Sequence, residues 1–102
     1  VSGLSHINTL LADPAVQSLE CTGPGKPLLI NRSGLIQATN FTLSADEINT
    51  FMREISERTR IPLTQGLFKA FVGNLIITAV ISEIIGTRFV MQKRYIAQFQ
   101  PQ

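Results

Sequence analysis

The sequence has one cysteine, no tryptophan and no apolar run long enough to cross a membrane. Cys21 alone excludes an internal disulfide and a metal site built from cysteines, and we expect it to be a small buried hydrophobe in a reducing compartment. A membrane-spanning helix needs about 20 apolar residues, but polar residues interrupt the run 75–85. No basic start precedes an apolar stretch, as it would in a signal peptide. We therefore expect a cytoplasmic protein without direct membrane insertion.

An excess of charge of one sign is also nearly absent. Nine Lys and Arg against seven Asp and Glu give a net charge of +2, which is weak support for a nucleic-acid partner, and we expect none. Hydrophobic residues at 44% and charged residues at 16% are typical of a globular chain, and 102 residues suffice for one domain with one core. The sequence begins with Val and ends on a Gln-rich tail, so we expect a piece of a larger protein.

The segment 67–83 carries the strongest structural signal, two apolar runs separated by Gly73-Asn74. Gly and Asn tolerate the positive φ of two-residue hairpin turns, so this pair predicts a β-hairpin. The turn also sets the register, which separates a uniformly apolar face from a mixed one. Such a hairpin needs further strands beside it and helices over it. The inward face is predicted to hold Phe68, Ala70, Val72, Leu75, Ile77, Ala79 and Ile81.

The best helix is predicted to begin at Ser44, because Ser44-Ala-Asp-Glu47 has the pattern of a capping box. A core-facing stripe at i, i+3, i+4 and i+7 follows, and Ile61-Pro62 stops the helix. The outer side is predicted to be a solvated, ion-paired face, with a docking surface as the alternative. The stripe consists of Ile48, Phe51, Met52 and Ile55, and the outer side of Arg53, Glu54, Glu57, Arg58 and Arg60.

The remaining elements complete an order of helix, three strands, helix and three strands. A short helix from Ser5 to Ala12 is expected to end at Asp13-Pro14. Tight turns between strands favour antiparallel pairing. The sequence thus predicts an α+β fold: a single antiparallel sheet of about six strands with two helices packed on one face, a PAS-like two-layer sandwich. The further strands are expected at 16–21, 28–32, 35–43 and 87–93.

Residues that could carry catalysis or hold a metal are scarce. No GxxxxGK(S/T) phosphate loop occurs, and Gly23-Pro-Gly-Lys26 has a proline where an amide donor is wanted, so it predicts a plain turn. His6 is the only histidine and has no second ligand at metal-binding spacing, so a structural role is expected. We predict no catalytic residue and no metal site in this chain.

Three basic residues near the C-terminus, Arg88, Lys93 and Arg94, are the most distinctive polar feature. If Phe89 and Met91 point inward, Arg88 and Arg94 point outward. Two interpretations remain open. The charges could keep an edge strand soluble, or they could meet an anion supplied by a later part of the protein.

Three segments are similar, in order and spacing, to motifs of one family. The segment 10–25 is similar to an opening motif Leu-x-Asp-Pro-x-Val-x-(Glu/Asp)-Ile-x-x-x-Gly-Pro, and its Gly23–Pro27 turn is most like archaeal members. The hairpin 73–80 lies where the family has Asp-Gly-Ser-Arg, and 87–94 lies where it has a closing strand with Phe and basic residues. The chain resembles the N-terminal domain of the type II and type IV secretion ATPases, the superfamily of GspE, PilT, CpaF and the archaeal pilus and archaellum motors.

The resemblance implies a non-catalytic domain at 1–94 and a linker at 95–102 toward an ATPase core outside this sequence. Such a domain contributes to closing the nucleotide site, to subunit contacts and to coupling with the machinery for protein transport or pilus assembly. Implied partners are the RecA-like core of the same chain, neighbouring subunits of a homo-hexamer, and secretion or pilus proteins. ATP and Mg would bind only to the parent protein, an ATPase held peripherally at the inner face of the membrane through partners.

The resemblance also suggests which residues approach the nucleotide. Lys93 matches the basic residue that ends the family's closing strand, whereas Gln92 stands where an Arg is usual. The hairpin Arg of the family is replaced by Leu75 or Ile76. The candidate cofactor-binding residues are Arg88, Lys93 and Arg94. The alternative function is a free-standing PAS-like small-ligand sensor or a protein-interaction module, with a pocket between sheet and helix.

Overall fold

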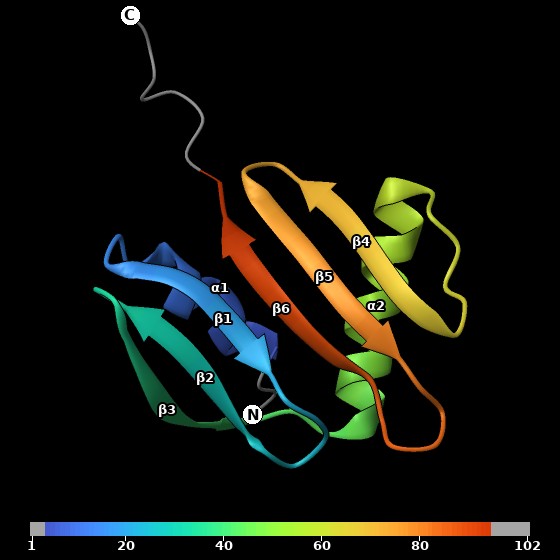
Figure 1. Cartoon of the computed structure of the whole chain (residues 1–102), viewed down its shortest axis with the longest axis horizontal. Helices are drawn as coiled ribbons and strands as arrows, with labels where there is room; N and C mark the ends of the chain where they lie inside the picture. Colours follow the sequence, from blue (N-terminus) through green and yellow to red (C-terminus); the bar gives the residue numbers. More distant parts are fainter. Residues whose placement is uncertain (1–3, 95–102) are drawn as a thin grey trace, which may run out of the picture.

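The computed structural model describes residues 4–94 as one six-stranded antiparallel sheet with both helices on the same face (Figure 1). This confirms the predicted α+β class. No helix in the described part is long and apolar enough to cross a membrane. The elements are α1 (Leu4–Ala12), β1 (Val16–Cys21), β2 (Pro27–Arg32), β3 (Leu35–Thr42), α2 (Ala45–Thr59), β4 (Gly66–Val72), β5 (Leu75–Ile81) and β6 (Arg88–Lys93).

The strand order is β3-β2-β1-β6-β5-β4, so the last strand lies in the middle of the sheet. Strands β1 to β3 form one antiparallel unit and β4–β5 form a hairpin. β6 joins the two, because Val90 is paired with Glu20 of β1 on one side and with Thr78 of β5 on the other. The sheet is continuous only because β6 is inserted there.

The β4–β5 hairpin has the predicted register. Ala70 pairs with Ile77 and Val72 with Leu75, and Gly73 takes a φ of 60° in the turn. The predicted inward face is the core face: four of its seven side chains are buried and the other three pack against the core. The buried four are Phe68, Ala70, Ile77 and Ala79.

Helix α2 begins with the predicted capping box. The Ser44 hydroxyl accepts from the Glu47 amide at 3.2 Å, and the Ser44 amide donates to the Glu47 carboxylate at 2.9 Å. The stripe packs onto the sheet, where the Phe51 ring stacks on Phe89 with 4.8 Å between centroids. The helix ends at Thr59, one residue before Arg60, whose left-handed φ of 63° turns the chain away ahead of Ile61-Pro62.

One part of the α2 prediction is wrong. Glu54 and Glu57 are exposed as expected, but within the described chain no ion pair within 4.0 Å joins them to the neighbouring arginines. An exposed pair gains little over hydration and loses side-chain entropy, so it need not form. The outer face of α2 is solvated but not ion-paired.

Helix α1 covers the β1 side of the same sheet face. Ile7 is buried, and the ring of the half-buried His6 stacks on Phe41 with 3.9 Å between centroids and 11° between planes. This contact gives His6 a packing role between α1 and β3. Cys21 at the end of β1 is fully buried in the same core.

Candidate basic site beside Phe71

Strand β6 carries Arg88 and Lys93, and Arg94 follows it directly, but the three predicted site residues are not brought together. Arg88 is its first residue and pairs with Val80, whereas Lys93 is its last and pairs with Leu75 beside the hairpin turn. A strand rises about 3.3 Å per residue, so roughly 16 Å separate these two positions. Lys93 and Arg94 adjoin at one end of the sheet, and Arg88 lies at the other.

Arg94 lies over an exposed aromatic ring on the sheet face that the helices leave uncovered. Its guanidinium carbon is 5.2 Å from the centroid of Phe71, and the Lys69 ammonium is 5.9 Å from the same centroid. Both distances are within the range of cation–π attraction. The Arg94 amide also donates to the Asn74 carbonyl at 2.7 Å. Two cations are therefore held beside the Phe71 ring at the point where the chain leaves β6. Phe71 exposes 57% of its surface.

Lys93 makes a different contact. Its ammonium donates to the Asp13 carbonyl oxygen at 3.0 Å, and the residue is half-buried. Asp13 itself is fixed, because its carboxylate accepts from the Ala15 amide at 2.9 Å and pairs with Arg32 at 3.1 Å. Lys93 thus ties β6 to the Asp13-Pro14 segment. One donor of an ammonium is used in this way and two remain for another partner.

Lys69 and Phe71 are the members of this site that sequence reasoning missed. The hairpin register already placed both on the outward face, two residues apart. What was not available was the position of β6, which brings Arg94 across β5 to the Phe71 ring.

The chemistry of the site suits an anion more than a metal. A guanidinium and an ammonium can together bind a phosphate or carboxylate group, and the ring can stack a planar group. All three side chains are solvent-accessible, so they would bind strongly only when a second surface excludes water. Among residues 4–94, no group of three or more His, Cys, Asp or Glu is placed to hold a metal ion.

The same sheet face is apolar at its other end. Leu67 is 72% exposed and Val80 39% exposed, and the two are paired across β4 and β5, four residues along β4 from Phe71. Exposed apolar patches on a sheet commonly mark contact with another protein surface. The basic site therefore lies at one end of a face that is chemically suited to being covered.

Comparison with known proteins gives a fold relationship. No family model matches the chain, and no curated protein does. Among solved structures, the chain superposes on the VirB11 ATPase from the Brucella suis type IV secretion system, determined in complex with sulphate, with a TM-score of 0.79. The two are 12% identical, and the match covers 96% of this chain. Its fold resembles part of a type IV secretion ATPase.

The VirB11 match agrees with the secretion-ATPase part of the sequence resemblance. At 12% identity it establishes the fold alone, and it does not separate the GspE, PilT, CpaF and archaeal branches. The chain spans 32% of the VirB11 chain. The match therefore gives the fold of this chain and not the activity of the whole VirB11 protein.

Proposed function

We propose that this chain is the non-catalytic N-terminal domain of a hexameric secretion or pilus-assembly ATPase. The observation that carries the proposal is the VirB11 superposition, which covers nearly all of this chain but only about a third of a secretion ATPase. The order of the three sequence segments supports it independently. In this proposal the parent protein binds ATP and Mg, acts in the cytoplasm, and reaches the inner face of the membrane through its partners.

The domain would act through its uncovered sheet face, which would pack against a second protein surface. Arg94 lies where the chain leaves the sheet, beside the uncovered face, so a RecA-like core that follows in the chain can approach both. Exclusion of water at that contact would strengthen the attraction of Arg94 and Lys69 for a phosphate. Neighbouring subunits and secretion or pilus proteins are the other proposed partners. The role of 95–102 as a linker concerns residues outside the described part and stays a prediction.

The three predicted contact residues differ in how directly they can be tested. The Arg94 side chain lies over the Phe71 ring and makes no hydrogen bond to a described residue, whereas Lys93 also holds Asp13. Arg88, at the far end of β6, would need a separate contact on the same face. All three remain candidates for nucleotide contact, and Arg94 is the most informative to change.

We expect Arg94→Ala to lower ATP turnover of the parent protein by about tenfold, the loss that one charge-assisted hydrogen bond to the transferring phosphate would give. The measurement is steady-state phosphate release with Mg-ATP. Arg53→Ala, on the exposed side of α2, serves as the control and should leave turnover unchanged. Lys93→Ala should lower turnover as well, but its result is read together with a thermal melt because the bond to Asp13 is lost.

Two outcomes would contradict the proposal. Arg94→Ala and Arg53→Ala could have equal turnover, which would remove Arg94 from the nucleotide site. More broadly, the reading frame that encodes this chain could lack a GxxxxGK(S/T) segment, in which case no ATPase core accompanies it.

The alternative is a free-standing PAS-like sensor or protein-interaction module. A sensor would require a ligand-sized cavity between helix and sheet. A cleft of about 440 Å³ lies beside α2 and is open to solvent, so it favours a sensor less than an enclosed cavity would. Ligand binding to that cleft can be tested without reference to ATP.

A further inference from the structure

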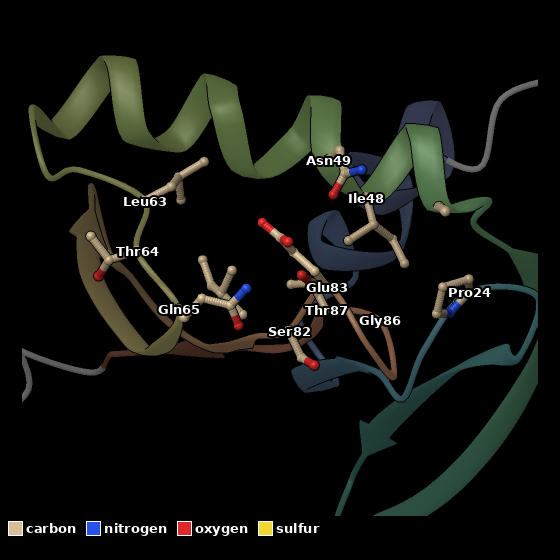
Figure 2. A pocket seen from close by; sticks show the side chains of 12 residues that line it. Pro24, Ile48, Asn49, Leu63, Thr64, Gln65, Ser82, Glu83, Gly86 and Thr87 are labelled. Atoms are coloured by element: carbon tan, nitrogen blue, oxygen red, sulfur yellow. The ribbon is translucent and has the colours of Figure 1, made fainter.

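A cleft of about 440 Å³ opens between the first turns of α2 and the loops that precede β4 and follow β5 (Figure 2). This volume is within the range of small-molecule sites. Ile48 of α2 and Ile81 of β5 give it apolar walls, while Asn49 and Gln65 contribute side-chain amides. The cleft lies on the helix side of the sheet, away from the site beside Phe71.

Thr87 supplies a polar group that the fold does not use. It is 7% exposed and is the buried polar residue of the described core, yet its hydroxyl makes no hydrogen bond to any residue from 4 to 94. The hydroxyl oxygen itself keeps contact with solvent, because among the described residues the fully buried side-chain oxygen without a partner is Oδ1 of Asn31. Because Thr87 lines the cleft, its hydroxyl is available to a molecule bound there.

The charge of the cleft comes from Glu83 alone among the residues that line it. Figure 2 shows its side chain reaching from the loop toward α2 and Asn49. Although Glu83 is exposed, it forms no ion pair with a described residue. The positive end of the α2 dipole is close by, but Asp46 and Glu47 in the first turn offset it.

The loop that carries Glu83 is held in place by local contacts. The Ser82 hydroxyl accepts from the amides of Ile84 and Ile85, each at 3.2 Å. Gly86 takes a φ of 91° and packs so closely on Pro24 that a Cβ would lie 2.8 Å from the proline ring. The carboxylate is therefore presented from a defined turn beside the Gly23–Pro27 segment.

We propose that this cleft binds an ammonium or guanidinium group carried on a short apolar chain. Glu83 accepts charge-assisted hydrogen bonds from the cation, the Thr87 hydroxyl accepts another, and the apolar walls contact the chain. Phosphates and carboxylates are disfavoured, because no Lys, Arg or His lines the cleft and Glu83 repels them. The inference goes beyond the proposed ATPase role and does not depend on it.

The test is an NMR titration of the 102-residue chain with n-butylguanidinium and with n-butylurea, its uncharged isostere. We expect butylguanidinium to shift the backbone amides of Gln65, Glu83 and Thr87. Butylurea should bind about tenfold more weakly, because the charge-assisted bonds to Glu83 are lost. No nucleotide is present, so the result is separate from any test of ATP turnover.

Matched variants locate the contacts. Glu83→Gln keeps the shape of the side chain and should weaken butylguanidinium binding about tenfold, while Glu57→Gln makes the same change of charge away from the cleft and should not. Thr87→Val should weaken binding about threefold and Thr87→Ser should restore it. A thermal melt of each variant confirms that it is folded.

The source of the cation is distinguished by a third probe, N-acetyl-arginine methylamide. Binding at least as tight as that of butylguanidinium assigns the site to an arginine side chain of a polypeptide, and clearly weaker binding assigns it to a free small cation. The proposal is overturned if butylguanidinium causes no shifts at the cleft. Equal binding of butylurea, or unchanged binding by Glu83→Gln, would overturn it as well.

Discussion

Cys21 shows how this fold accommodates a lone thiol. It lies at the end of β1 with no exposed surface, and its Sγ donates to the Gly23 carbonyl oxygen at 3.6 Å. Burial raises the pKa of the thiol above its ordinary value, and the neighbouring Glu20 carboxylate raises it further. The sequence predicted a small buried hydrophobe at this position, and its burial is confirmed.

We expect Cys21 to react slowly with a thiol reagent in the folded chain and quickly in denaturant, since the thiolate is the reactive form. The same raised pKa has a stability consequence. Below the ordinary pKa the thiol is neutral in both states, and as pH rises above it the unfolded chain loses the proton first, so stability falls. Urea unfolding at a series of pH values should show this extra decline for the natural chain relative to Cys21→Ala. A difference that does not vary with pH, or rapid reaction in the folded state, would contradict the assignment.

Among helices and strands, the predictions that were confirmed rest on residues close together in the sequence. The β4–β5 register follows from Gly73-Asn74 and the period of two, and the α2 start follows from Ser44 and Glu47, all within a few residues of each other. The end of α2 was less predictable, because Arg60 takes a left-handed conformation that is uncommon for residues other than glycine. In α2, local physics thus specified where the helix begins better than where it ends.

The register of the hairpin predicts that the same substitution at two adjacent isoleucines lowers the stability of the fold by very different amounts. Ile77 is fully buried on the core face, so Ile77→Asp would place an unpaired carboxylate there, at a cost of several kcal/mol, and should unfold the chain. Ile76 points to the uncovered face and is only half-buried, so Ile76→Asp should cost about 1 kcal/mol or less. Circular-dichroism melts of both variants make the comparison. Similar melting temperatures would mean that the assignment of faces is wrong.

The candidate site was predictable only in part, for a reason that belongs to the sheet as a whole. Sequence reasoning identified Lys93 and Arg94, but the ring and ammonium beside Arg94 belong to β4, two strands away. Their proximity depends on β6 lying next to β5. The pairing of β6 with β1, such as Glu20 with Val90, joins residues far apart in the sequence, and no turn or periodicity specifies it. Strand composition predicted that a sheet forms but not the order of its strands.

The strand order leads to a prediction about the whole molecule. β6 supplies Phe89 and Met91 to the core and is the strand that joins β1–β3 to β4–β5. Fully burying one such side chain contributes about 1.5–3 kcal/mol, and a domain of this size is stable by only about 5–15 kcal/mol. A chain that ends at residue 86 should therefore lack a cooperative melt, whereas a control that ends at residue 94 keeps all six strands and should melt cooperatively.

A synthetic peptide of residues 87–94 tests the same point without changing the rest of the core. Added to the chain that ends at residue 86, it should restore the circular-dichroism spectrum, because it can refill the space between β1 and β5 and pair with both. A peptide with Val90→Pro should restore less, since proline cannot donate to the ladder and is poorly tolerated in a central strand. If the chain ending at residue 86 melts cooperatively without any peptide, then one of the two units is stable alone. The continuous core across β6 would then not be what holds this fold together.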